Sequence, residues 1–258
     1  ALYKTIELNM VVRKMSKRKI RKNADQISKR NMTIIYIRRM LVIMVIFLLI
    51  IYFILRIVYN AGRFTIILDS AGDPMSGLII YNQLSEKKPQ QKLEADEVEF
   101  FTNIAEEWLP ADIGNQAEGS HNGTNYIAYT FYVENRSDNE MEYWYEIWLD
   151  DVIRNVDEAL RVMVILNDQK TIYAKVNSTT KEPEMGKIPF RDEKEIIVEG
   201  RTGFKSGDVD KFTIVIWIEG NDPDCVDDLI GGEIKMHMEI REGHIDPNKK
   251  EEEGEKGK

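Results

Sequence analysis

An uninterrupted apolar stretch near the start of the chain constrains its fold more than any other feature. Residues 40–55 are sixteen consecutive apolar or aromatic residues, and residues 57–59 extend the run beyond Arg56. Twenty residues of α-helix rise about 30 Å, which matches the hydrocarbon thickness of a bilayer. A helix buried in a soluble core is the alternative, but such a helix normally has a polar face. Residues 40–59 are therefore predicted to form one transmembrane helix.

Charge is distributed very unevenly on the two sides of this stretch. Residues 1–39 contain twelve Lys or Arg and two acidic residues, whereas residues 60–258 contain 22 basic and 42 acidic residues. Short segments rich in Lys and Arg stay on the cytoplasmic side of a membrane. We therefore expect a single-pass protein of the cell membrane, with the basic tail (1–39) in the cytoplasm and a domain (60–245) outside.

A cleaved signal peptide is the competing interpretation of the N-terminal segment. The apolar run exceeds a normal signal-peptide core, and no A-x-A pattern follows it, so an uncleaved signal anchor is favoured. The basic residues between 10 and 32 either fix this topology alone or also attract anionic lipid headgroups.

The length, charge and cysteine content of the predicted outer domain limit the kinds of protein it can belong to. Its length suffices for one domain with a hydrophobic core, and its acidic charge disfavours nucleic acid as a partner. The chain has one cysteine, Cys225, whereas small secreted domains usually contain several in disulfides. We expect a bacterial protein that does not depend on disulfides, from a cell with a single membrane.

Alternation of apolar and polar residues predicts that the outer domain is all-β. Residues 125–135 and 141–149 alternate with a period of two, and residues 212–219 are nearly all apolar, which is typical of a central strand. Further strands are predicted at 64–68, 78–81, 160–166, 171–176, 195–198 and 232–241. Residues 112–125 are predicted to be a surface loop, and the charged tail (246–258) to be disordered. Short strands without a long amphipathic helix favour an antiparallel, jelly-roll-like β-sandwich.

A cluster of aspartates is the best candidate for a ligand site. Asp222, Asp224, Asp227 and Asp228 follow the apolar strand, and clustered carboxylates suit a hard cation such as Ca²⁺. Their spacing differs from that of an EF-hand, and a solvated acidic turn is the simpler interpretation.

Signals for catalysis are weak. His237 and His244 flank acidic residues in HMEIREGH, but their spacing differs from the helical HExxH of zinc proteases, and the remaining histidine, His121, falls in a predicted loop. The chain has no GxSxG motif and no P-loop. Trp144 and Trp148 share one side of a predicted strand, where they either stack on sugar rings or a partner, or form a second core face.

Three stretches resemble Gram-positive surface proteins of the camelysin and TasA type. They are NYIAYTFYVEN (125–135), VDEALRVMV (156–164) and FTIVIWIEGNDPDCVDDLIGGEIKMHMEI (212–240), together with a hydrophobic N-terminal segment that a strand soon follows. The resemblance implies a jelly-roll fold and a contribution to surface or matrix fibres, and some members are classed as metallopeptidases. This chain differs in its long basic segment before the anchor.

Together these features predict a non-enzymatic surface protein with a role in envelope structure, adhesion or partner binding. Self-association by strand addition would use an extended segment such as residues 64–68 to complete the sheet of a neighbour. The alternatives are a membrane-tethered metallopeptidase and an accessory or sensor subunit of an envelope complex.

Overall fold

The computed structural model describes residues 35–53, 64–69, 77–96, 98 and 102–243. The chain forms two compact units, residues 1–60 and 61–258. The predicted tail at 246–258 and His244 lie outside the described residues.

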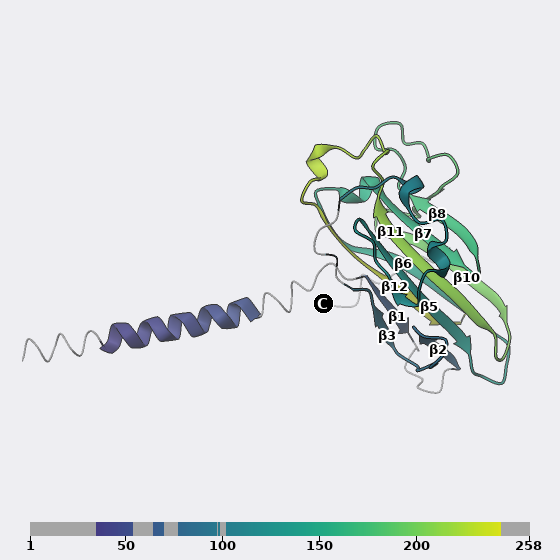
Figure 1. Cartoon of the computed structure of the whole chain (residues 1–258), viewed down its shortest axis with the longest axis horizontal. Helices are drawn as coiled ribbons and strands as arrows, with labels where there is room; N and C mark the ends of the chain where they lie inside the picture. Colours follow the sequence, from purple (N-terminus) through teal and green to yellow (C-terminus); the bar gives the residue numbers. More distant parts are fainter. Residues whose placement is uncertain (1–34, 54–63, 70–76, 97, 99–101, 244–258) are drawn as a thin grey trace, which may run out of the picture. The chain divides into compact units, whose positions relative to one another are not determined.

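The described part of the first unit is one α-helix, Ile35–Phe53, which is long and apolar enough to cross a bilayer (Figure 1). The side chains of Met40, Ile43 and Phe47 are more than half exposed. The prediction of one apolar N-terminal helix is confirmed. The helix begins five residues earlier than predicted and includes Arg38 and Arg39, while residues 54–59 lie outside the described residues.

The second unit is built almost entirely of strands (Figure 1). Their bounds are β1 Thr65–Asp69, β2 Leu78–Tyr81, β3 Lys92–Glu94, β4 Gly119–Ser120, β5 Tyr126–Asn135, β6 Met141–Ile153, β7 Leu160–Leu166, β8 Gln169–Ala174, β9 Ile188–Pro189, β10 Glu195–Phe204, β11 Val209–Ile218 and β12 Glu233–Glu242. Four short 3₁₀ helices connect them: η1 Glu106–Trp108, η2 Ile113–Asn115, η3 Val156–Ala159 and η4 Asp227–Leu229.

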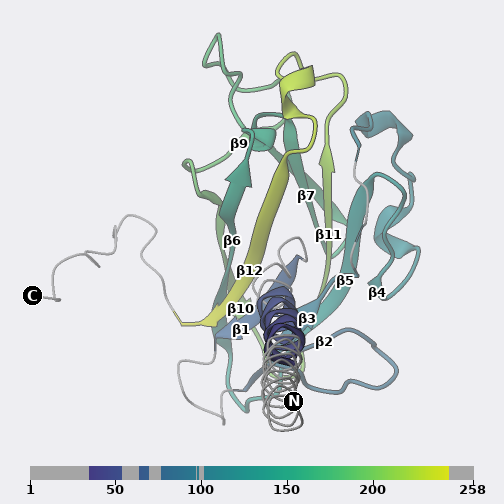
Figure 2. The same ribbon diagram turned by 90° about the vertical axis from the view of Figure 1, so that its left-hand side faces the viewer.

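The strands form two sheets that face each other, as Figure 2 shows. Sheet A has the order β10-β6-β12-β1-β3, and sheet B has the order β2-β5-β11-β7-β8-β9, with β4 paired to β5. The predicted β-sandwich with one N-terminal helix is thus confirmed. Most pairs are antiparallel, but β1 pairs with β12 and β8 pairs with β9 in parallel, so both sheets are mixed.

Apolar side chains from both sheets meet in one main core. Strand β11 lies between β5 and β7 and buries nearly every residue, as its apolar sequence predicts. Phe131 of β5 and Phe212 of β11 stack with ring centroids 5.2 Å apart, and Tyr145 of β6 meets Phe212 edge-on at 5.1 Å. The contact between Tyr145 and Phe212 joins the two sheets, and both contacts add to the burial of apolar area.

The predicted surface loop at 112–125 is wrong in part. Ile113 and Gly114 in η2 are buried, and Ile113 belongs to a small second core with Trp217 and Met163. His121 contacts the backbone carbonyl oxygens of Gly119 and Ile113 at 3.0 and 3.2 Å. The segment therefore covers the outer face of sheet B. The sequence did not indicate this, because isolated apolar residues such as Ile113 form no periodic pattern.

Candidate functional site

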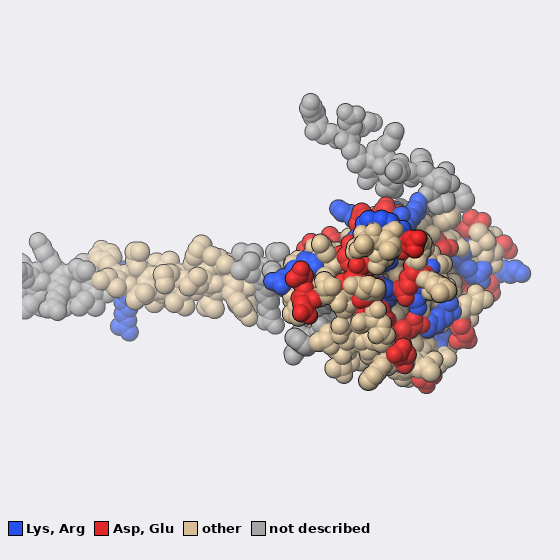
Figure 3. Space-filling view, turned by 90° about the horizontal axis from the view of Figure 1, so that it is seen from above, with Lys and Arg blue, Asp and Glu red and all other residues tan. Residues whose placement is uncertain are grey.

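A polar cleft lies where several loops meet at one end of the sandwich. Its volume is about 410 Å³, and residues from β7, η1 and two connecting loops line it. The lining residues are Glu106, Glu107, Arg161, Lys175, Asn177, Thr180, Glu182, Pro183, Glu184, Glu219, Asn221, Asp222 and Pro223. On the face of the molecule in Figure 3, acidic and basic side chains are interspersed rather than segregated.

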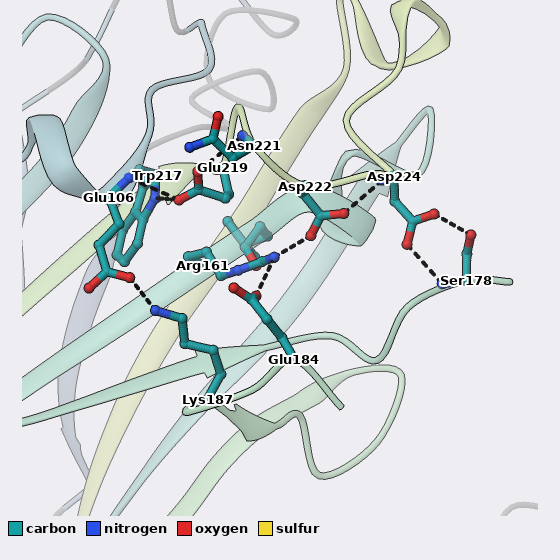
Figure 4. A network of polar contacts seen from close by, with 11 residues as sticks. Glu106, Arg161, Ser178, Glu184, Lys187, Trp217, Glu219, Asn221, Asp222 and Asp224 are labelled. Atoms are coloured by element: carbon teal, nitrogen blue, oxygen red, sulfur yellow. Dashed lines mark hydrogen bonds and ion pairs between the residues drawn. The ribbon is translucent and has the colours of Figure 1, made fainter. Parts of the chain in front are cut away.

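Arg161, the second residue of β7, lies at the centre of this cleft (Figure 4). Only 2% of its surface is exposed, and its guanidinium forms ion pairs with Asp222 and with Glu184, the latter at 2.6 Å. A third bond, of 2.9 Å, runs from Nη1 to the carbonyl oxygen of Leu160. Because a buried charge is stable only when it is paired, Arg161 fixes the two loops that carry Asp222 and Glu184.

Glu219 organises the neighbouring part of the cleft. Its carboxylate accepts hydrogen bonds from Trp217 Nε1 and from the backbone N–H of Glu106, both at 3.0 Å. It also accepts a bond of 3.1 Å from the backbone N–H of Asn221. Glu219 thus joins the end of β11 to η1, and it satisfies the polar end of the fully buried Trp217 side chain.

Glu106 extends this network to two lysines. Its carboxylate contacts Lys187 and, at 3.0 Å, Lys170. Burial raises the pKa of Glu106, but the hydrogen bonds from the two lysines outweigh burial and hold the pKa below its usual value. Glu106 is therefore ionised at neutral pH and holds η1 against β8 and the segment before β9.

Two of the four predicted calcium ligands belong to this cluster. Asp222 pairs with Arg161, and Asp224 accepts bonds from the hydroxyl and the backbone N–H of Ser178, the latter at 2.8 Å. Burial raises the pKa of Asp224, but the hydrogen bonds from Ser178 and the positive charges of Lys181 and Arg161 together hold the pKa below its usual value. Asp227 and Asp228 form the exposed first turn of η4. Within the described residues, no group of three or more His, Cys, Asp or Glu side chains is arranged to hold a metal. Calcium binding stays a prediction.

The two described histidines belong to different sheets. His237 lies on the outer face of sheet A, with Nδ1 at 2.7 Å from Asp150 Oδ1 and Nε2 at 3.6 Å from Glu239 Oε1. His121 lies beside β4 of sheet B and contacts backbone carbonyl groups. The structure therefore does not bring these two residues together as ligands of one zinc ion.

Trp144 and Trp148 are half-buried on the outer face of sheet A, beside Gly200 and Glu195 of β10. Trp148 Nε1 donates a hydrogen bond of 3.0 Å to Glu146. Gly200 is required beneath Trp144, because a Cβ atom at this position would lie only 2.9 Å from the indole ring. The two tryptophans thus cover the outside of the sheet and do not form a second enclosed core.

Sequence reasoning missed the central residue of the cleft. Arg161 interrupts the apolar strand sequence LRVMVIL, and a charged residue in a buried strand indicates a buried ion pair. The position of Arg161 was therefore detectable, but its partners Glu184 and Asp222 lie 23 and 61 residues away along the chain. Only the fold brings these three residues together.

Comparisons with known proteins leave the family open. No family model matches the chain, and no curated protein matches its sequence. Among solved structures, the chain is similar to β-glucosidase from Kluyveromyces marxianus, in a complex with glucose and in a Se-Met labelled form. Each match has 12% identity and a TM-score of 0.22 and covers 67% of this chain but only 17% and 18% of the β-glucosidase chains. Likeness at this level supports no conclusion about function.

Proposed function

We propose that the protein is a membrane-anchored surface protein of a Gram-positive bacterium, in which an acidic β-sandwich serves in envelope structure, adhesion or partner binding without catalysing a reaction. The apolar helix holds the sandwich at the outer face of the cell membrane. The basic N-terminal segment remains in the cytoplasm.

The length and apolar character of the helix are the observation that carries this proposal. Ile35–Phe53 is long and apolar enough to cross a bilayer, and its charged residues, Arg38 and Arg39, lie in its first two turns. The other seventeen residues are apolar or aromatic, so the helix has no polar side to turn toward water, whereas a bilayer satisfies such a surface. The positive charge before the helix and the negative charge after it favour the orientation with the N-terminus inside.

The polar cleft supports a binding role rather than catalysis. Three of its acidic side chains are paired with cationic ones: Asp222 and Glu184 with Arg161, and Glu106 with Lys170 and Lys187. Such pairs hold loops in one shape, which lowers the entropy cost of binding a partner. These three carboxylates are held in ion pairs, whereas a catalytic base needs a carboxylate or imidazole free to exchange protons.

The topology can be tested in intact cells that produce the full chain with a different epitope at each end. External protease is expected to remove the C-terminal epitope and to spare the N-terminal one until the membrane is permeabilised. The intact mass of the membrane-bound protein should still include the basic segment. A C-terminal epitope that is cut only after permeabilisation, or a mature chain that starts after residue 60, would contradict the proposal.

Self-association by strand exchange is a second candidate, in keeping with the resemblance to fibre-forming surface proteins. The predicted donor segment is β1, which in this chain lies between β12 and β3 of its own sheet. Ile67 pairs with Glu239 of β12, so donation of β1 to a neighbour would recreate the same parallel pairing between two chains.

A disulfide between β1 and β12 distinguishes a β1 that pairs within its own chain from a β1 that is donated to a neighbouring chain. In a Cys225→Ser background, the double variant Ile67→Cys/Glu239→Cys is expected to form a ladder of linked chains when it is oxidised at the cell surface. The single variant Ile67→Cys is the matched control and should give at most a linked pair. A double variant that closes only within one chain and stays monomeric would rule out exchange of β1.

The metallopeptidase alternative makes a separate prediction. It requires stoichiometric zinc in the purified full chain and caseinolytic activity that is lost on chelation. A chain free of zinc and of such activity supports the non-enzymatic proposal.

A further inference from the structure

A second cavity lies between the two sheets and differs in chemistry from the polar cleft. Its volume is about 760 Å³, and most of its walls are apolar side chains of β5, β7, β11, β12 and η3. The lining residues are Phe64, Val98, Thr102, Asn103, Ile127, Val156, Leu160, Ile216, Ile218, Cys225, Val226, Asp227, Leu229, Ile230, Gly231, Gly232, Glu233, Ile234 and Met236.

The size and lining of this cavity match a ligand site rather than a packing defect. Protein cores are close-packed and rarely contain a void larger than a water molecule. Ligand sites, in contrast, have volumes of about 300–1,000 Å³ with mostly apolar walls and few polar groups. Ile127, Leu229 and Ile234 are only partly buried although they pack against the main core. Among the described residues, the sandwich thus remains open at this end.

The arrangement of polar groups restricts the ligand further. The polar side chains of the lining are Thr102, Asn103, Asp227 and Glu233, all of them exposed, whereas Leu160 and Ile216 of the walls are buried. A fitting ligand therefore has a long apolar part for the walls and a small polar end at the solvent side. The carboxylates of Asp227 and Glu233 disfavour an anionic end and accept hydrogen bonds from hydroxyl groups.

We propose that this cavity binds one acyl chain of a lipid with a small uncharged, hydroxyl-bearing head, such as a monoacylglycerol. The inference rests on the proposed membrane anchorage for the source of its ligand, because a domain tethered to a bilayer meets lipids at a high effective concentration. The sandwich would then shield an apolar chain from water, with η4 and the glycines that follow it at the rim.

The single cysteine of the chain provides the test. Cys225 lines the cavity and is partly exposed, so a bound chain should shield its thiol from a reagent. The full chain is reconstituted in phosphatidylcholine nanodiscs, and the rate of its reaction with a chromogenic disulfide reagent is followed as 1-decanoylglycerol is added. We expect the rate to fall at least tenfold and to saturate, and decanoate, with an anionic head, to protect much less at the same concentration.

Two kinds of variant make this result specific. Ile234→Trp on β12 and Leu229→Trp in η4 fill the cavity from different elements, and protection by the lipid should be lost in whichever of them folds, as judged by circular dichroism. The control Cys225→Ser/Ser206→Cys moves the thiol to the exposed turn between β10 and β11, where the lipid should have no effect.

Three outcomes would overturn the inference. They are a rate that does not saturate with the lipid, equal protection by decanoate, and protection that persists in folded Ile234→Trp and Leu229→Trp variants. Because this readout uses reconstituted protein, its failure leaves the topology assay in cells intact, and an inverted topology would leave this readout unchanged.

Discussion

Asp210 is expected to be the most sensitive polar position in the sandwich. It lies near the start of β11, only 2% exposed, and its carboxylate accepts three side-chain hydrogen bonds. Tyr143 of β6 donates at 2.6 Å and Arg201 of β10 at 3.0 Å, both from sheet A. Asn167, in the turn between β7 and β8 of sheet B, donates at 2.7 Å. Asp210 therefore joins the two sheets through one buried charge.

The expected loss of stability on substitution follows from the number and kind of these hydrogen bonds. A hydrogen bond to a charged group contributes about 1.5–3 kcal/mol to stability. Tyr143→Phe removes one such bond and leaves Asp210 with two donors, so we expect a loss within that range. Asp210→Ala removes all three and leaves the Tyr143 hydroxyl buried without its acceptor, so a loss of about 3–5 kcal/mol is expected.

Urea unfolding of the full chain, followed by tryptophan fluorescence, measures both losses because Trp217 is fully buried. The matched control is Tyr173→Phe, which removes the hydroxyl of another tyrosine of the main core; we expect it to cost less than about 1 kcal/mol. In a double-mutant cycle, Tyr143→Phe and Asp210→Asn should couple by at least about 1 kcal/mol. Additive losses, or an equal effect of Tyr173→Phe, would refute this account of Asp210.

Three further outcomes can be measured on the same protein. Asp222→Ala should lower the free energy of unfolding by about 3 kcal/mol because it removes a partner of the buried Arg161 guanidinium, whereas Asp227→Ala in the exposed turn should change it by less than about 0.5 kcal/mol. Gly200→Ala should destabilise by about 1–3 kcal/mol, since the added Cβ would clash with the Trp144 ring. Burial raises the pKa of Tyr173 to about 12, and it raises the pKa of Tyr145 further. The contribution of these two tyrosines to stability should therefore be fully present below pH about 10, where tyrosines of the unfolded chain begin to ionise. Above that pH, the free energy of unfolding should fall by about 1.4 kcal/mol per pH unit for each of the two tyrosines, until the folded-state pKa is reached. Unfolding curves measured at alkaline pH test this.

Period-two patterns made most of the sandwich predictable from its sequence. In β6, Tyr143, Tyr145 and Ile147 point into the core as their alternation predicts, and in β12 Met236, Met238 and Ile240 do the same. Strand ends were less predictable. Strand β10 continues from the predicted 195–198 to Phe204, although Glu199 and Gly200 have low strand propensity, because pairing with β6 determines its length.

Local sequence patterns could not predict which distant segments pair with each other. Nothing in residues 64–68 indicates a parallel neighbour, yet β1 pairs with the last strand of the domain. The Arg161 and Asp210 clusters have the same origin, since each joins side chains that are far apart in the sequence. The aspartate cluster is the converse case, because Asp222 and Asp224 face different partners once the loop is folded, and Asp227 and Asp228 are exposed.

The pairing of Asp222 with Arg161 limits how tightly the aspartate loop can bind calcium. A Ca²⁺ ion needs six to eight oxygen ligands, and Asp222 can serve only by giving up its pairing with Arg161, which would leave a buried cation with Glu184 alone. Binding should therefore be no tighter than about 10⁻⁴–10⁻³ M, the range of weak extracellular sites. Calorimetric titration of the full chain measures this affinity, and Asp227→Ala/Asp228→Ala leaves the Arg161 pair intact as a control. A micromolar affinity that this double variant abolishes would show that the loop rearranges around the ion, and that its contacts to Arg161 and Ser178 belong only to the metal-free form.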